Sequence, residues 1–114
     1  MSFRILKTIQ NKNNLNEIVA LDYHNYIIRG INGNKLEAKI QFQNGPRNVE
    51  GSTSGVLDHE LLEIVRDRLK HFQEGEFACR ENALALTHIE EALMWMNQRT
   101  VDRASRGVLG TYNK

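Results

Sequence analysis

The stretch DHELLEIVRDRLKHFQEGEFACRENALALTHIEEALMWMNQRTVDRAS runs from Asp58 to Ser105 and sets the architecture of the chain. Apolar residues recur in it at spacings of three and four, which is the period of an amphipathic helix. Gly75 interrupts the pattern and ends a first helix that Asp58 is predicted to cap. A second helix begins between Phe77 and Glu81 and ends near Ser105. The short link predicts that the two helices are antiparallel neighbours.

Each predicted helix has one apolar face. In the first helix this face consists of Leu61, Leu62, Ile64, Val65, Leu69 and Phe72. In the second helix it consists of Leu86, Ile89, Leu93 and Met96, which leaves Trp95 on another face as a candidate for contact with a second chain. Cys79 is the only cysteine, and we expect it to be a buried structural thiol.

The residues before the helices have the features of a sheet. The expected strands are Phe3–Ile9, Glu17–Leu21, Tyr26–Ile31 and Leu36–Phe42. Asn32-Gly33 predicts a tight hairpin turn, because both residues tolerate a positive φ. Pro46 cannot donate to a strand ladder and ends the sheet. The polar segment Glu50–Gly55 is interpreted as a flexible junction. We therefore predict an α+β fold: a small N-terminal antiparallel β-sheet packed on a C-terminal two-helix hairpin with one long helix.

The chain of 114 residues has the length of a single domain. We divide it into a β-rich part (1–50), a helical hairpin (56–106) and a C-terminal tail (107–114). Its net charge of about +1 disfavours a nucleic-acid polymer as partner. No apolar run approaches the length of a membrane span, and the single cysteine fits a reducing compartment. We expect a soluble intracellular protein that does not bind membranes.

Standard catalytic signatures are absent: the sequence has no phosphate-binding loop, no nucleophile elbow and no zinc-spaced Cys/His set. The adjacent residues Asp58, His59 and Glu60 point in different directions on a helix, so they do not form a metal site. We predict no catalytic residue, no metal and no cofactor.

Three arginines line the last turns of the second helix, namely Arg99, Arg103 and Arg106. They are either a solvated face that compensates the helix dipole or a clamp for phosphates, which Arg binds in bidentate geometry. Phe72 is either a core residue or a stacking surface for a base. Asn82 is either a surface residue or a reader of a base edge or ribose hydroxyl. The residues alone leave both alternatives open.

From about Ala38 to Asn113 the sequence resembles the Thoeris anti-defence sponges of phages, of the first type described. The matching segments are FQNGP (42–46), GVLDHELLEIVRDRLKHFQ (55–73), GEFACRENALALTHIEEALMWMNQRT (75–100) and DRASRGVLGTYN (102–113). The helical part is also similar to a hairpin domain that is shared with phage anti-CBASS sponges. The first 35 residues carry no recognisable motif.

The resemblance implies a protein that binds and holds cyclic ADP-ribose isomer signals (glycocyclic ADP-ribose) without cleaving them, in the cytoplasm of an infected bacterial host. It also implies a second site for the cyclic di- or trinucleotides of CBASS. The residues it implies for cyclic ADP-ribose are Phe72, Asn82, Arg99, Arg103, Gly45 and Pro46. Those it implies for a cyclic oligonucleotide are Arg106, Gly107, Gly110 and Thr111.

Asn82 and Arg103 are 21 residues apart on one predicted helix, which is roughly 31 Å. A ligand of nucleotide size does not span that distance, so the two residues contact one ligand only if they come from different subunits. We therefore expect a homodimer with two pockets at its interface, with assembly to a hexamer as an open alternative.

Two other functions stay open at this point. The chain could be an enzyme that degrades such a signal, with a base such as His71, Glu81 or Glu91 near the pyrophosphate. It could also be a nucleic-acid or protein interaction module that uses the arginine-rich helix end, in which case oligonucleotide binding is sensitive to salt.

Overall fold

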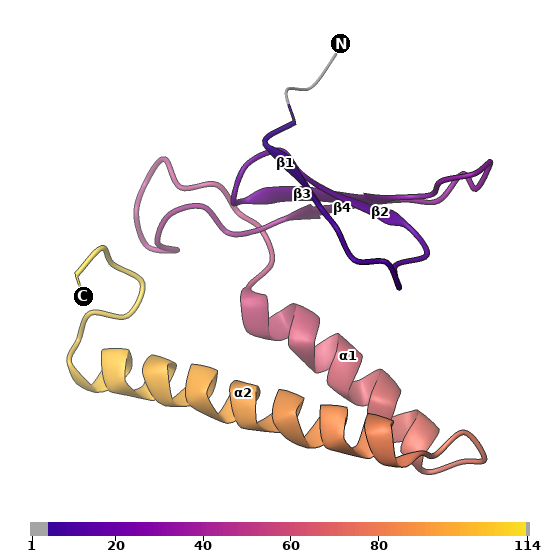
Figure 1. Ribbon diagram of the computed structural model, residues 1–114. Helices are drawn as coiled ribbons and strands as arrows, with labels where there is room; N and C mark the ends of the chain where they lie inside the picture. Colours follow the sequence, from indigo (N-terminus) through magenta and orange to yellow (C-terminus); the bar gives the residue numbers. More distant parts are fainter. Residues whose placement is uncertain (1–4, 114) are drawn as a thin grey trace. The chain divides into compact units, whose positions relative to one another are not determined.

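The computed structural model describes residues 5–113 and contains a four-stranded antiparallel sheet followed by two helices, as predicted (Figure 1). The strands are β1 (Lys7–Ile9), β2 (Glu17–Ala20), β3 (Asn25–Arg29) and β4 (Glu37–Gln41), and their order in the sheet is their order in the sequence. The predicted first strand began at Phe3, which lies outside the described residues. The fold is α+β.

Sheet register follows from the turns that join the strands. Asn32 (φ 54°) and Gly33 (φ 86°) both adopt a positive φ between β3 and β4, which confirms the turn predicted from the Asn-Gly pair. Arg29 pairs with Glu37 across this hairpin. In the β2–β3 turn the backbone N–H of His24 and the side chain of Asn25 donate to Asp22, and these bonds lower the pKa of the Asp22 carboxyl.

The sheet contributes the only fully buried apolar side chains among residues 5–113. Val19 is 1% exposed and Ala20 is 0% exposed, both on β2. β2 lies between β1 and β3, so it has neighbours on both edges. Tyr26 of β3 and Phe42, which follows β4, pack edge to face with ring centroids 5.7 Å apart.

The segment predicted to be a flexible junction is instead partly tied to the sheet, which corrects the sequence interpretation. Phe42 forms a parallel bridge with Val56, and Asn44 forms an antiparallel bridge with Thr53. The side-chain amide of Gln41 donates to the backbone oxygen of Ser54 at 2.7 Å. A polar composition does not reveal such pairing, because backbone groups make most of these bonds.

The first helix, α1 (Asp58–Gln73), has its cap one residue before the predicted position. Leu57 is the N-cap, and Asp58 is the first helical residue. The Glu60 carboxylate accepts from the backbone N–H of Leu57 at 2.7 Å and so satisfies one of the donors at the helix start. Asp58 still favours this end, because a carboxylate in the first turn interacts well with the helix dipole.

The second helix, α2 (Arg80–Ser105), is the long helix that the sequence predicted. Its N-cap is Cys79, whose sulfur accepts from the backbone N–H of Asn82 at 3.4 Å. Cys79 is exposed, so the expectation of a buried thiol is wrong. The thiol caps the helix from the connecting link, and the link lies at the end of the hairpin rather than between its helices. The turn after α2 contains Gly107 (φ 73°).

Two compact units make up the chain. One contains the sheet (1–44 and 53–56), and the other contains both helices, the loop 45–52 and the C-terminal tail. In the second unit α1 and α2 contact each other and form a hairpin, with the link at one end of α2 and the tail at the other (Figure 1). No helix within the described part of the chain is long and apolar enough to cross a membrane.

The predicted apolar face of α2 is confirmed, since Leu86, Ile89, Leu93 and Met96 are all half-buried. The predicted face of α1 is only partly right. Ile64 is 64% exposed and Val65 is also exposed. Neither helix has a fully buried residue, because one neighbouring helix covers only a narrow stripe of side chains.

Candidate ligand-binding site

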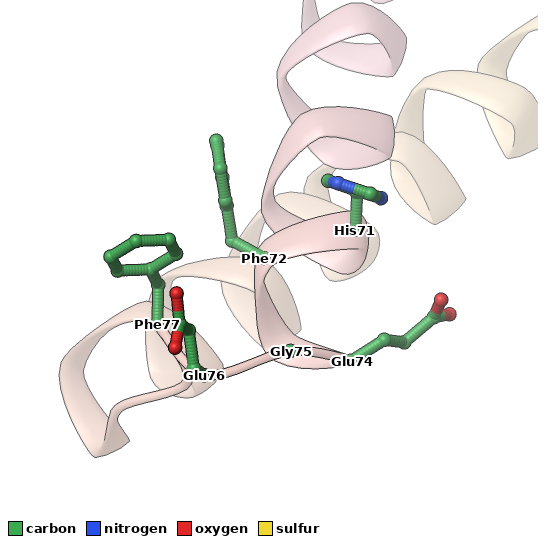
Figure 2. A pocket seen from close by; sticks show the side chains of 6 residues that line it. All are labelled: His71, Phe72, Glu74, Gly75, Glu76 and Phe77. Atoms are coloured by element: carbon green, nitrogen blue, oxygen red, sulfur yellow. The ribbon is translucent and has the colours of Figure 1, made fainter.

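A cavity of about 400 Å³ lies at the link between the two helices (Figure 2). Its lining residues are His71, Phe72, Glu74, Gly75, Glu76 and Phe77. Phe72 is one of the residues that the family resemblance implies for the ligand. Phe77, at 66% exposure, also lines the cavity.

The two phenylalanines form an aromatic corner. The rings of Phe72 and Phe77 meet edge to face at 86°, with centroids 6.3 Å apart. The guanidinium carbon of Arg68 lies 5.0 Å from the Phe72 centroid, a cation–π distance. Figure 2 shows both rings on one side of the link, with Glu76 beside Phe77 and Glu74 pointing away from them. Aromatic rings at such a corner can pack against a planar base.

Gln73 holds the link in shape. Its side-chain oxygen accepts from the N–H of Cys79 at 3.0 Å, and its side-chain nitrogen donates to the Cys79 carbonyl at 3.1 Å. One amide therefore closes the loop of residues 74–78 that forms most of the cavity wall. Sequence reasoning did not identify Gln73, since a glutamine at a helix end gives no signal that it bonds backbone groups six residues later.

Asn82 lies near this cavity in sequence, in the first turn of α2, and is half-buried. Its backbone N–H is used by the Cys79 sulfur. Its side-chain amide makes no hydrogen bond to any of residues 5–113, so it keeps both donors and the acceptor for a ligand.

Arg99 and Arg103 lie toward the opposite end of α2. Arg99 is exposed, and its side chain has no hydrogen bond or ion pair within residues 5–113. Arg103 is half-buried, and its Nη2 donates to the carbonyls of Val108 and Thr111, each at 3.0 Å. The two arginines therefore differ. The Arg99 side chain bonds none of residues 5–113, whereas the Arg103 side chain is oriented by its hydrogen bonds to the tail.

Gly45 and Pro46 belong to the same end of the molecule as these arginines. Their loop joins the tail through a hydrogen bond from the Asn48 N–H to the Gly110 carbonyl at 3.3 Å. Gly45 has φ 93°, and a Cβ placed on it would lie 3.3 Å from the Tyr112 hydroxyl. The loop thus meets the tail at two points.

The four residues of the implied second site are on or next to the tail. Arg106 caps α2, and its Nε bonds the Asp102 carboxylate at 3.1 Å. Gly107 (φ 73°) has open space around it, whereas Gly110 (φ 78°) is packed against Asn48. The Thr111 hydroxyl donates to the Val108 carbonyl. Gly110 and Thr111 therefore have roles inside the fold.

The candidate residues fall into two clusters. We call Phe72 and Phe77 at the link, with Asn82 in the first turn of α2, the aromatic cluster. We call Arg99 and Arg103 in the last turns of α2, with Gly45 and Pro46 of the loop that bonds the tail, the cationic cluster. The length of α2 separates them in one chain. Within residues 5–113 no three His, Cys, Asp or Glu side chains lie close enough together to hold a metal ion.

Comparison with known proteins identifies the hairpin. Residues 34–101, more than half of the chain, match the family model described as "Acb2/Tad1, hairpin domain". A similar relative is "Thoeris anti-defense 1" of Bacillus phage SBSphiJ7, which is 46% identical over 94 residues. The match covers 75% of this chain and 66% of that relative, slightly less than two thirds of its length. The resemblance seen in the sequence is thereby confirmed, and the chain belongs to the Acb2/Tad1 hairpin-domain family.

Proposed function

We propose that this protein is a phage anti-defence sponge that binds a cyclic ADP-ribose isomer and holds it without cleaving it, inside the infected bacterial host. The observation that carries the proposal is the separation of an aromatic cluster and a cationic cluster by one long helix. A cyclic ADP-ribose has one base, two riboses and a diphosphate, so it needs both kinds of cluster. The name of the Bacillus phage relative supports the anti-defence role.

The aromatic cluster is suited to the base and ribose of such a ligand. Stacking on an aromatic ring contributes about 1–3 kcal/mol per base. Glu74 and Glu76 line the same cavity, and their carboxylates would repel a diphosphate but accept hydrogen bonds from ribose hydroxyls. The charges therefore argue that the diphosphate lies elsewhere.

The cationic cluster is suited to the diphosphate. Arg99 and Arg103 are four residues apart and so lie on one face of α2. Two guanidinium groups on one face match the two phosphates of a pyrophosphate, because Arg99 can bind phosphate oxygens in bidentate geometry and Arg103 can donate to them from Nε and Nη1. We propose that the loop carrying Gly45 and Pro46 covers this end of the ligand.

We propose further that the complete pocket forms between two copies of the chain. If two α2 helices pack antiparallel, the aromatic cluster of one copy lies next to the cationic cluster of the other, and a two-fold axis makes two such pockets. The exposed apolar side chains of the hairpin support this association, since each loses contact with water in an interface. They are Ile64, Val65, Leu84, Met94, Trp95 and Val101. We propose the hexamer as a higher assembly of such dimers.

The absence of cleavage is part of the proposal. A sponge needs tight binding and slow release, which enclosed aromatic and arginine contacts provide without a general base. The rival enzyme would use His71, which lines the cavity, as its base. The two functions differ in one observable, the chemical state of the ligand after binding.

The test is incubation of the purified protein with glycocyclic ADP-ribose isomers, followed by filtration, heat denaturation and chromatography of the released material. Retention followed by recovery of intact ligand supports the sponge. A chemically altered ligand would establish the enzyme instead. Passage of all ligand through the filter would contradict the proposal, and binding of single-stranded oligonucleotides at low salt would then favour the interaction module.

A second site for cyclic di- or trinucleotides is proposed at Arg106, Gly107, Gly110 and Thr111. Its support is the exposed Arg106 side chain next to Gly107, where open space lets a phosphate approach the backbone. Each nucleotide of a cyclic oligonucleotide carries one phosphate, so a symmetric assembly could present several copies of this corner to one ring.

A further inference from the structure

Arg103 is held by backbone carbonyls of the tail that follows its helix. Its Nη2 donates to two backbone carbonyls of the tail, those of Val108 and Thr111. Its Nε and Nη1 donate to no residue among 5–113. Carbonyl oxygens are neutral, so they orient the guanidinium without cancelling its charge. Arg106, by contrast, bonds the Asp102 carboxylate, which offsets its charge.

The tail can reach Arg103 because of its backbone geometry. The chain reverses at Gly107 (φ 73°), and the N–H of Val108 then donates to the carbonyl of Arg103 at 3.0 Å. A second reversal at Gly110 (φ 78°) turns the Thr111 carbonyl toward the same guanidinium. Positive φ is disfavoured for residues with a Cβ, so the two glycines make this shape accessible.

The same tail also holds the loop that carries Gly45 and Pro46. The Asn48 N–H donates to the Gly110 carbonyl, and the Asn48 side chain packs on the Gly110 Cα side, where a Cβ would come within 2.4 Å of Nδ2. Gly110 therefore stands between the loop on one side and the carbonyl that orients Arg103 on the other. The tail therefore bonds both the loop that carries Gly45 and Pro46 and the side chain of Arg103.

We propose that the tail, Gly107 to Asn113, is a positioning element that holds Arg103 with its unused donors directed at the diphosphate, and that Gly110 is the positioning residue on which this depends. The inference rests on the proposed function. Its physical basis is preorganisation: a long arginine side chain that is ordered before binding loses less conformational freedom when the ligand arrives.

The test is Gly110→Ala, with binding of glycocyclic ADP-ribose measured by calorimetry. An added Cβ strains a residue at positive φ and meets Asn48, so the turn shifts and the Thr111 carbonyl leaves Arg103. We expect the affinity to fall about tenfold, because the released Arg103 side chain must lose its conformational freedom when the ligand binds. Gly33→Ala is the matched control, because Gly33 also has a positive φ (86°) but has open space and lies in the sheet hairpin.

A second measurement separates positioning from general loss of structure. In ligand-free protein, side-chain ¹⁵N NMR should show slow rotation of the Arg103 guanidinium in the wild-type chain and in Gly33→Ala, and fast rotation in Gly110→Ala. Combined with Arg103→Lys, which keeps the charge but lacks the fork, Gly110→Ala should cost much less affinity than it does alone.

The outcomes separate this inference from the proposed function. Wild-type chain that does not retain the ligand would overturn the proposed function, whatever the NMR shows. If the wild-type chain binds the ligand and Gly110→Ala binds it equally well, only the positioning role is overturned. The same holds if the wild-type chain binds and the Arg103 guanidinium rotates freely in both the wild-type chain and Gly110→Ala. An equal loss of affinity in the wild-type and Arg103→Lys backgrounds would also overturn it, because the tail would then act through something other than Arg103.

Discussion

Asn82 and Arg103 lie on the same unbroken helix, α2, one in its first turn and the other in its last. They are 21 residues apart, which at 1.5 Å per residue is roughly 31 Å. The structure thus confirms the continuous helix on which the sequence argument depended. A ligand of nucleotide size can touch both residues only where two chains meet, so the two ends of α2 and the surface between chains can be tested separately.

Arg99→Ala should weaken binding of the cyclic ADP-ribose isomer without destabilising the protein. Charge-assisted hydrogen bonds contribute about 1.5–3 kcal/mol, so we expect roughly a ten- to hundredfold loss of affinity in calorimetry. The melting temperature should stay unchanged, because Arg99 is exposed and bonds no described residue. Lys39→Ala, which removes an exposed cation of the sheet, is the control and should bind normally. Normal binding by Arg99→Ala would remove Arg99 from the site.

Phe72→Ala should reduce affinity by about 1–3 kcal/mol, the contribution of stacking on one base. Phe72→Tyr preserves the ring and the contacts with Phe77 and Arg68, so it should retain most of the affinity. Fluorescence titration with the ligand measures both variants. If Phe72→Ala and Phe72→Tyr bind the ligand with the same affinity, Phe72 does not stack on the base.

Trp95→Glu should convert the proposed dimer to monomer and abolish ligand binding at the same time. Trp95 is 63% exposed on the hairpin, and a carboxylate there would have to lose its water in an interface. Analytical ultracentrifugation gives the mass. Tyr23→Glu changes a comparably exposed aromatic residue in the sheet unit and should leave the mass unchanged. An unchanged mass for Trp95→Glu would place the interface elsewhere.

Gln73→Ala should loosen the link that walls the aromatic cavity. The change removes two hydrogen bonds to Cys79, each with a net contribution of about 1 kcal/mol, so the melting temperature should fall by several degrees. Affinity should fall as well, since the loop of residues 74–78 would no longer be closed. Gln98→Ala, at an exposed position of α2, is the comparison and should melt like the wild type. Identical melting of both variants would show that the amide does not hold the link.

Arg106→Ala should reduce binding of a cyclic trinucleotide and spare binding of cyclic ADP-ribose. The exposed Arg106 bonds Asp102 and lies beside the open backbone at Gly107. Calorimetry with each ligand separately measures the two affinities. A loss for both ligands would mean that Arg106 supports the cationic cluster, and a loss for neither would remove the proposed second site.

Much of the secondary structure followed from local rules. The Asn32-Gly33 pair predicted its turn correctly because the required φ values belong to those two residue types. The period of apolar residues predicted both helices, and Gly75 marked the end of the first. The location of Phe72 at a helix end, and of Arg99 and Arg103 in the last turns of α2, needed only the sequence.

The failures share a cause. Cys79 was interpreted as a buried thiol and Ile64 as part of the apolar face of its helix, from the average behaviour of their residue types, and both are exposed. Whether an apolar side chain is covered depends on how many elements surround it, and this hairpin has only two helices among the described residues. The residues of a helix do not show how many other helices or strands of the same chain will pack against it.

Spacing and chemistry along the chain were enough to establish the order of strands and helices and the residue types available for a nucleotide ligand. The family was indicated by the resemblance of its sequence segments to known proteins. Three further features emerged only from the folded chain: Gln73 closes the link, residues 53–56 join the sheet, and the tail orients Arg103. These are bonds between side chains or backbone groups that turns and chain reversals bring together. Their partners depend on the path of the chain in space, which no local pattern of residues records.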